Sequence, residues 1–197
     1  MSFKILLAGD THIPDRADRI REVVLRRIEP EKPFNYVLFT GDLTSKDILE
    51  WLRTLGSEIR VVRGNMDYLP LPRRQVLEIE NLKIGIVHGD GVYPRGDAAG
   101  LARISRELGT SILASGHTHS PFIKTDPSRE ILLLNPGSLT GVWGGGGGSM
   151  KPSFMILTVE SGRLMIELYV LEDNVVKSRR YMAVNRNNSW NITQLEE

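Results

Sequence analysis

Short, almost uninterrupted runs of apolar and β-branched residues recur along the first two thirds of the chain. They occupy residues 3–8, 36–40, 59–63, 83–87, 112–114 and 131–134. Continuous apolar runs of this length are typical of strands that are covered on both faces of a sheet. We therefore predict six buried strands in this part of the chain.

Helical spacing of apolar residues appears between several of these runs. Apolar side chains fall on one helical face at positions 20–28, 48–55 and 101–108. Ser45 stands where a side chain would cap the start of the second helix. Strands that alternate with amphipathic helices favour an α/β fold built in layers.

The last third of the chain has a different pattern. Residues 153–159, 163–171 and 175–184 predict closely spaced strands joined by tight turns, and residues 75–80 pair naturally with 83–87 in a further hairpin. The fold that we predict is a four-layer α/β/β/α sandwich of two mixed sheets flanked by helices. It would comprise one domain, residues 1–184, followed by a polar tail, residues 185–197, with Trp190 as its anchor.

Composition excludes several classes of protein. The chain of 197 residues contains no cysteine, so a disulfide framework, a thiolate nucleophile and a cysteine-ligated zinc are excluded. The formal net charge of +1 does not suggest bulk binding to nucleic acid or to an anionic membrane. No signal peptide or membrane span is apparent. We expect a cytoplasmic protein with neither a membrane nor a nucleic acid as its partner.

All four histidines directly follow predicted strands, and so do three other polar residues. These seven side chains are Asp10, His12, Asp42, Asn65, His88, His117 and His119. Functional groups in open α/β sheets collect beyond the carboxyl ends of the strands. We therefore expect the seven side chains to meet at one rim, brought there by glycine-containing turns.

Carboxylate, amide and imidazole donors together suit borderline divalent ions such as Mn, Fe, Co, Ni or Zn. Seven donors are too many for one four-coordinate ion. They fit two ions about 3.5–4 Å apart that share a carboxylate. The residues alone thus predict a binuclear metal centre.

The motifs formed by these residues resemble those of the calcineurin-like metallophosphoesterases, from residue 3 to about residue 184. The matching segments are Asp10-x-His12, Gly41-Asp42, Gly64-Asn65, His88-Gly89, Gly116-His117-x-His119 and Asn135-Pro136-Gly137-Ser138. The last segment resembles the small, single-domain phosphodiesterase branch. The resemblance implies that one metal is held by Asp10, His12 and His119.

The same resemblance implies that a second metal is held by Asn65, His88 and His117, that Asp42 bridges the two, and that a hydroxide shared by the metals attacks phosphorus. It implies a metal-dependent phosphodiesterase that hydrolyses phosphodiesters or small activated phosphate esters. Manganese is the metal we expect first, with Ni, Co, Fe or Zn as alternatives. The resemblance leads us to expect a homodimer, and so does the polar tail with Trp190, because such a tail rarely orders without a surface on which to dock.

One position departs from the family pattern. Many members have a histidine directly after the Gly-Asn pair, where this chain has Met66, which cannot donate a proton to the leaving group. Asp67 could replace it or could be an ionised group that orients the loop, and we take Asp42, Asn65 and Asp67 as candidate catalytic residues. Arg16, Arg63 and Arg95 are candidate phosphate contacts, and Trp143 either covers the site or packs locally.

Two other functions remain open. The chain is also similar to the small scaffold subunit of retromer, in segments that include Gly96-Asp97-Ala98-Ala99 and Pro152-Ser153-Phe154. That resemblance implies a protein-interaction scaffold, with catalysis vestigial or secondary. Several metal-ligand positions carry other residues in that subunit, whereas all seven are present here. A DNA nuclease of the recombination-repair branch is less well matched, because those enzymes are longer and keep the histidine that is missing here.

Overall fold

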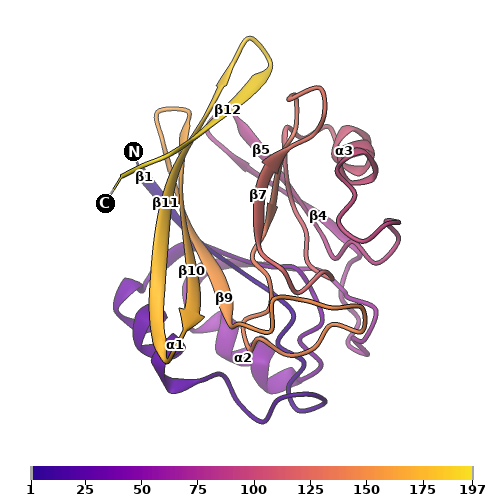
Figure 1. Ribbon diagram of the computed structural model, residues 1–197, viewed down its shortest axis with the longest axis vertical. Helices are drawn as coiled ribbons and strands as arrows, with labels where there is room; N and C mark the ends of the chain where they lie inside the picture. The colour runs from indigo at the N-terminus through magenta and orange to yellow at the C-terminus, as the bar shows by residue number, and fades with distance from the viewer. Residues whose placement is uncertain (1, 197) are drawn as a thin grey trace.

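The computed structural model of the chain describes residues 2–196 and contains two β-sheets (Figure 1). The larger sheet has seven strands in the order β12-β11-β10-β9-β1-β2-β3. Their bounds, in chain order, are β1 Ser2–Ala8, β2 Phe34–Phe39, β3 Gly56–Val61, β9 Ser153–Glu160, β10 Arg163–Glu172, β11 Val175–Arg186 and β12 Ser189–Gln194.

The smaller sheet has five strands in the order β4-β5-β6-β8-β7. Their bounds are β4 Arg74–Ile79, β5 Leu82–Val87, β6 Ile112–Ala114, β7 Phe122–Thr125 and β8 Leu132–Asn135. Both sheets are mixed: β1, β2 and β3 run parallel to one another, as do β5, β6 and β8, and antiparallel strands flank each parallel group.

Three helices cover the outer faces of the sheets. They are α1 (Glu22–Ile28, continued by a short 3-10 turn at Glu29–Glu31), α2 (Lys46–Arg53) and α3 (Ala98–Glu107). The predicted cap is present, because the Ser45 side chain accepts a hydrogen bond from the Asp47 N–H at 3.0 Å. Asp97 caps α3 in the same way through the Gly100 N–H. In Figure 1, α1 and α2 lie together and α3 lies on the opposite side of the molecule.

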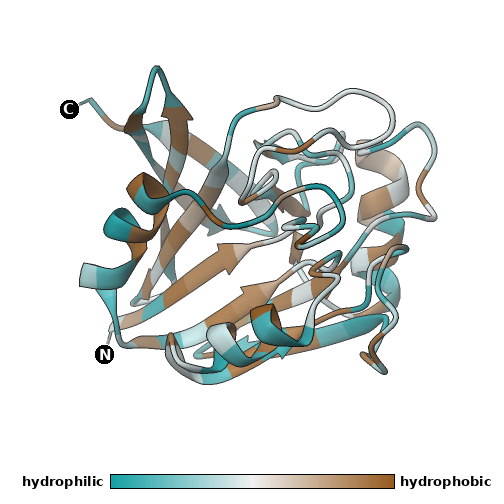
Figure 2. Cartoon of the chain, turned by 90° about the horizontal axis from the view of Figure 1, so that it is seen from below, coloured by the Kyte–Doolittle hydropathy of each residue, from teal (hydrophilic) through white to brown (hydrophobic). Residues whose placement is uncertain are grey.

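Neighbouring apolar residues of one strand face different cores, as the alternation of side chains along a strand requires. Leu7 points into the core between the two sheets, where it joins Ile84 and Ile86 of the smaller sheet. Leu6 points the other way and packs in a second core with α1 and α2. A third core lies between the smaller sheet and α3. Three cores between four layers confirm the predicted α/β/β/α sandwich, and Figure 2 shows its apolar strands inside polar helical surfaces.

The six predicted strands of the first two thirds, the first hairpin and the three long strands near the end are all present, with ends shifted by a few residues. Two strands were not predicted. β7 is a short edge strand whose residues are all partly exposed. β12 lies in the segment expected to be a polar tail, where it pairs with β11 and places Trp190 in the core between the sheets, fully buried.

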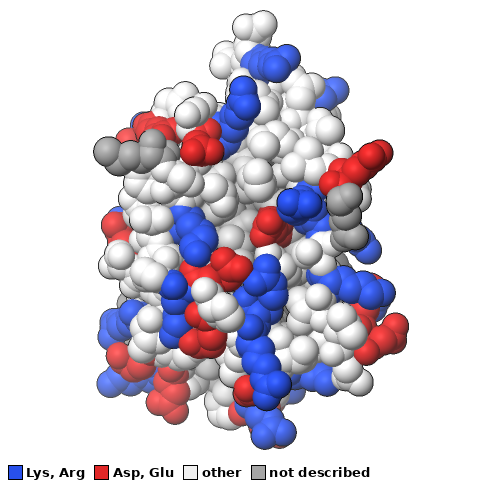
Figure 3. All heavy atoms as spheres, turned by 90° about the vertical axis from the view of Figure 1, so that its left-hand side faces the viewer, with Lys and Arg blue, Asp and Glu red and all other residues white. Residues whose placement is uncertain are grey.

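Trp190 therefore docks on its own chain. The ordered tail supplies no argument for a second copy, and the expected homodimer rests on the family resemblance alone. No helix within residues 2–196 is long and apolar enough to cross a membrane. Figure 3 shows acidic and basic side chains interspersed over one side of the molecule, in keeping with the net charge of +1.

Candidate metal centre

The parallel strands of both sheets end at a common rim, and each delivers polar side chains there. Asp10 and His12 follow β1, Asp42 follows β2 and Asn65 follows β3, which are adjacent strands of the larger sheet. His88 follows β5, and His117 and His119 follow β6, which are adjacent strands of the smaller sheet. The backbone ladder continues into these loops, because the Asp10 N–H donates to the Gly41 carbonyl and the His12 N–H to the Asp42 carbonyl.

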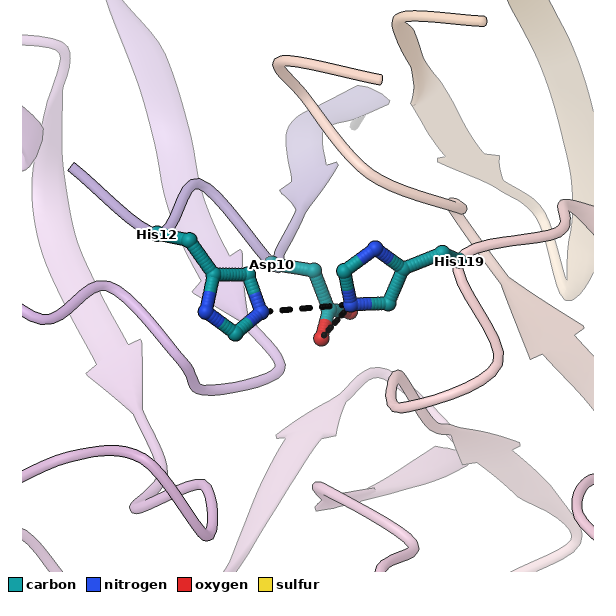
Figure 4. A group of neighbouring side chains, drawn as sticks. All are labelled: Asp10, His12 and His119. Atoms are coloured by element: carbon teal, nitrogen blue, oxygen red, sulfur yellow. Dashed lines mark hydrogen bonds and ion pairs between the residues drawn. The ribbon is translucent and has the colours of Figure 1, made fainter. Parts of the chain in front are cut away.

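The structure brings all seven predicted ligands together. On the side of His12, its Nε2 lies 3.2 Å from His119 Nε2, which in turn lies 3.4 Å from Asp10 Oδ1 (Figure 4). On the side of His88, its Nε2 lies 3.0 Å from Asn65 Oδ1 and 3.3 Å from His117 Nδ1. The donor atoms thus form two clusters, one from each predicted ligand set.

Asp42 joins the two clusters. Its Oδ2 lies 3.4 Å from His12 Nε2 and 3.3 Å from His88 Nε2, while its Oδ1 accepts the Met66 backbone N–H at 2.8 Å. One carboxylate oxygen therefore faces both halves of the site. Asp10 also contributes to both halves, since its oxygen atoms lie within 4.8 Å of donors in the group with His12 and His119 and in the group with Asp42 and His88.

Most of the site is buried and rich in groups that attract positive charge, although Asn65 is exposed and His117 is partly buried. Asp10 and His12 have no exposed surface, and Asp42 and His88 have almost none. Within residues 2–196, the ion-pair partners of the two carboxylates are histidines. Buried carboxylates need a cation or a dense set of hydrogen bonds, so this donor set fits divalent ions of the borderline class.

Electrostatics differ sharply between the histidines. Burial disfavours the charged form of His88, but its contact with Asp42 and the charge of Asp10 outweigh burial and raise the pKa of His88 to about 9. Burial, the charge of His88 and that of Arg95 lower the pKa of His117 to about 4. The two carboxylates thus stabilise a positive charge at the centre of the cluster, and the same field would act on a bound divalent ion.

Backbone carbonyls orient two of the histidines. The Nδ1–H of His88 donates to the Thr40 carbonyl at 2.8 Å, and the Nδ1–H of His119 donates to the Val142 carbonyl at 2.7 Å. Each bond fixes the tautomer in which Nε2 presents a lone pair to the site. His12 differs, because its buried Nδ1 has no hydrogen-bond partner within the described chain.

The loops that carry the ligands are tightly packed and conformationally strained. Five of the seven ligands have left-handed backbone angles, with φ between 47° and 67°: Asp10, His12, Asp42, His117 and His119. A β-carbon at Gly116 would come within 2.6 Å of Asp10 Oδ2, and one at Gly64 would collide with Asp42. Strain of this kind clusters at functional sites, where surrounding packing maintains it.

Two residues outside the ligand set hold these loops. Ser138 donates its hydroxyl to the Asp10 carbonyl at 2.7 Å and accepts the Val142 N–H, so it connects the loops of Asp10 and His119. Asn135 donates to the Gly116 carbonyl at 2.8 Å. The Asn135–Ser138 segment is part of the resemblance in sequence, but only the structure shows that it braces two ligand loops.

The predicted candidates around Met66 separate into different environments. Met66 is half exposed and reaches Asp42 through its backbone N–H. Asp67 is buried, and its two oxygens accept three backbone N–H groups, from Asp42, Gly64 and Thr44, at 2.8–2.9 Å. Of the two roles open for Asp67, this geometry favours the loop-orienting one.

A family model described as the calcineurin-like phosphoesterase superfamily domain matches residues 3–162. The chain belongs to this superfamily. A protein of Methanocaldococcus jannaschii described as a probable metallophosphoesterase is 48% identical over 67% of this chain and 66% of its own length. One of Methanothermobacter thermautotrophicus with the same description is 42% identical over 81% of this chain and 88% of its own length.

Solved structures of Vps29 share the fold across almost their whole length. Wild-type Vps29 of Entamoeba histolytica complexed with Zn²⁺ is 38% identical, with a TM-score of 0.83 over 91% of this chain and 98% of that one. Both resemblances drawn from the sequence, to the metallophosphoesterases and to the retromer subunit, are therefore confirmed. The chain itself has buried Asp and His groups that are suited to binding divalent metals.

Proposed function

We propose that the chain is a two-metal-dependent phosphodiesterase acting on phosphodiesters or small activated phosphate esters. The observation that carries the proposal is the position of Asp42 Oδ2, within 3.4 Å of a histidine from each ligand cluster. In this proposal Asp10, His12 and His119 hold one ion, Asn65, His88 and His117 hold the other, and Asp42 serves both. Two divalent ions there would activate water and neutralise charge on phosphate oxygens.

The chain's own residues determine how that chemistry is supported. The carbonyls of Thr40 and Val142 keep His88 and His119 oriented, and Asp67 fixes the turn that carries Asp42 and Asn65. Met66 leaves the usual proton-donor position without a titratable group. We therefore expect good leaving groups to be favoured. We also expect diesters to be favoured over monoesters. Manganese is the metal that we expect first.

Metal analysis combined with turnover tests this proposal. The full chain would be stripped with chelator, reloaded with Mn, Ni or Co, and assayed on bis(p-nitrophenyl) phosphate and p-nitrophenyl phosphate. We expect two ions per chain and faster turnover of the diester. Fewer than two ions at saturation, or no metal-dependent turnover of the diester, would overturn it.

A second candidate function is a protein-interaction scaffold, because Vps29 structures resemble this chain over nearly their full length. One of them, from Chaetomium thermophilum, is complexed with a cyclic peptide and is 26% identical, with a TM-score of 0.78. The presence of all seven donor side chains favours chemistry over scaffolding alone. If the reloaded protein binds two ions but turns over neither ester, the scaffold becomes the better proposal.

A further inference from the structure

Exposed large apolar side chains gather on the loops around the metal centre. Of the six such side chains in residues 2–196, five lie on loops that carry a candidate ligand or touch one, and only Val175 lies elsewhere, at the turn between β10 and β11. The five are Met66, Tyr68, Tyr93, Trp143 and Met150. Exposed apolar groups that gather around a polar site indicate a ligand with an apolar part.

Among these five residues, Trp143 is the one whose backbone is held next to the metal centre by hydrogen bonds. Its neighbour Val142 accepts the hydrogen bond from His119, and its own carbonyl accepts one from Arg16 Nη1 at 2.9 Å. Arg16 belongs to the turn after His12, because its N–H donates to the His12 carbonyl at 2.8 Å. Trp143 is thus held beside the His12–His119 half of the centre.

The ring of Trp143 remains available although its backbone is fixed. It is 56% exposed, and the Arg16 guanidinium lies 5.8 Å from the ring centroid. A planar, electron-rich surface whose backbone is anchored and which is left half open to solvent is suited to stacking against another planar group. The arrangement differs from local packing, in which the ring would be covered by its own chain.

A second arginine holds the same loop at the next residue. Arg95 Nη1 donates to the Gly144 carbonyl at 2.6 Å, and the backbone of Gly144 packs on His119 so closely that a β-carbon would lie 2.8 Å from the ring. Arg16 and Arg95 are both exposed and each presents a planar fork of donors. The two guanidinium groups, bound to the adjacent carbonyls of Trp143 and Gly144, provide the positive charge that an anionic ester requires.

We infer that Trp143, on a loop whose backbone is held by Arg16 and Arg95, is a stacking platform that selects phosphodiesters with a planar aromatic ester group, such as an aryl or nucleoside group. This inference rests on the proposed function, since it names the substrate class of the same site. Trp143 acts here as a specificity-determining residue and not as a catalytic one. Arg16 and Arg95 contribute charge that is independent of the shape of the ester group.

Two unreactive diesters of equal charge separate planarity from size. Diphenyl phosphate and dicyclohexyl phosphate would each be titrated calorimetrically into the Mn-loaded full chain. We expect diphenyl phosphate to bind about tenfold more tightly, since stacking on an aromatic side chain is typically of this magnitude. Trp143→Leu should abolish that preference, whereas Trp143→Phe should keep most of it.

Further variants separate charge from stacking. Arg95→Gln removes both the charge and the bond to the Gly144 carbonyl, so it should weaken both diesters and should reduce the preference for diphenyl phosphate less than Trp143→Leu does. Val175→Ala, which truncates an exposed apolar side chain on a hairpin that carries no candidate ligand, should leave both affinities unchanged. Equal binding of the two diesters by the wild-type chain, or a preference that survives in Trp143→Leu, would overturn the inference.

These measurements do not depend on turnover. A chain that prefers diphenyl phosphate but hydrolyses no ester would contradict the proposed phosphodiesterase while supporting the platform. A chain that hydrolyses diesters but does not prefer diphenyl phosphate would support the proposed phosphodiesterase and contradict the platform.

Discussion

The carboxylate of Asp67 accepts the backbone N–H of Asp42 at 2.8 Å, so one buried acid positions another. The same oxygen accepts the Gly64 N–H, and the second oxygen accepts that of Thr44. Three backbone donors from two loops therefore converge on a single side chain. The turn that presents the central ligand of the site depends on a residue outside the ligand set.

Replacing Asp67 should therefore damage metal binding through geometry. Asp67→Ala leaves three buried N–H groups without their acceptor, and we expect a loss of unfolding free energy on the order of 3 kcal/mol. Loss of such a supporting group should also weaken Mn binding about 10- to 100-fold. Urea unfolding and calorimetric Mn titration would measure the two effects. Asp67→Asn, which keeps one acceptor oxygen, should recover part of both; a fully stable Asp67→Ala with normal Mn affinity would contradict the role.

Asp42→Asn tests whether one carboxylate serves two ions. We expect it to lower occupancy of both sites and remove most activity, because Asp42 Oδ2 faces both His12 and His88. His12→Ala should affect one ion more than the other. Metal content after dialysis and turnover of bis(p-nitrophenyl) phosphate would be measured together. Two tightly bound ions and near-normal turnover in Asp42→Asn would show that the carboxylate does not bridge.

The metal-free protein should have a stability maximum near pH 6.5. The pKa of His88 is raised from 6.5 to about 9, so its contribution to stability is complete below pH 6.5 and is lost as pH rises through 9. The pKa of His117 is lowered to about 4, so its contribution is complete above pH 6.5 and is lost as pH falls through 4. Urea unfolding in chelator between pH 4 and 9.5 would measure this dependence.

His88→Asn is the control for that profile. It should reduce the decline on the alkaline side most, and it should also reduce the acid side in part, because the charge of His88 helps to lower the pKa of His117. Mn binding should strengthen as pH rises towards 9, because a metal ligand must lose its proton. A stability profile that is unchanged by His88→Asn would mean that the proton is held by another group.

Much of the fold could be predicted because the buried positions of the strands and helices carry apolar residues. Runs such as Ile5–Leu7 are apolar at every position because the two neighbours face different cores, one between the sheets and one under the helices. β12 was missed for the opposite reason: Trp190 is its one fully buried residue, and its other residues are polar or partly exposed. β7 is a four-residue edge strand that is only partly buried on each face, so its hydrophobic pattern is too short to predict it.

The candidate site was predicted as a set of residues but not as a structure. The four histidines, each placed after a strand, indicated the rim on which the donors meet. The bracing contacts could not be inferred from the chain, because the hydroxyl of Ser138 and the carboxylate of Asp67 bind backbone groups of loops that are remote in sequence. Every residue has a backbone carbonyl, so the role of the Thr40 carbonyl as an acceptor cannot be inferred from the residue type.

Met66 should limit the reaction with poor leaving groups. No ligand is lost at this position, so p-nitrophenolate, which needs little protonation, should leave readily. Met66→His should flatten the dependence of rate on leaving-group pKa and raise the rate most for alkyl or nucleoside esters, by at most ~10²-fold. A series of aryl phosphodiesters would measure both slopes. Equal slopes, with the Met66 protein already fast on poor leaving groups, would mean that another group supplies the proton.

Trp190 should contribute to the stability of the whole domain. We expect Trp190→Ala to lower the unfolding free energy by about 3–5 kcal/mol, because it empties a large volume in the core between the sheets. Trp190→Phe should be tolerated better, since the buried Nε1 has no hydrogen-bond partner within the described residues. Trp143→Ala, at an exposed position, is the matched control and should change stability little. Similar losses for the two Ala variants would place Trp190 outside the cooperative core.

The left-handed backbone at Asp10, His12, Asp42, His117 and His119 has an evolutionary consequence. Glycine is the residue that adopts this conformation without a penalty. At each of these positions, glycine, which has no side chain, would therefore give the least strained backbone. Substitutions that increase stability would therefore replace the metal ligands one at a time and leave the four-layer fold intact. A lineage released from selection for chemistry would be expected to keep this architecture for other uses while its metal ligands disappear.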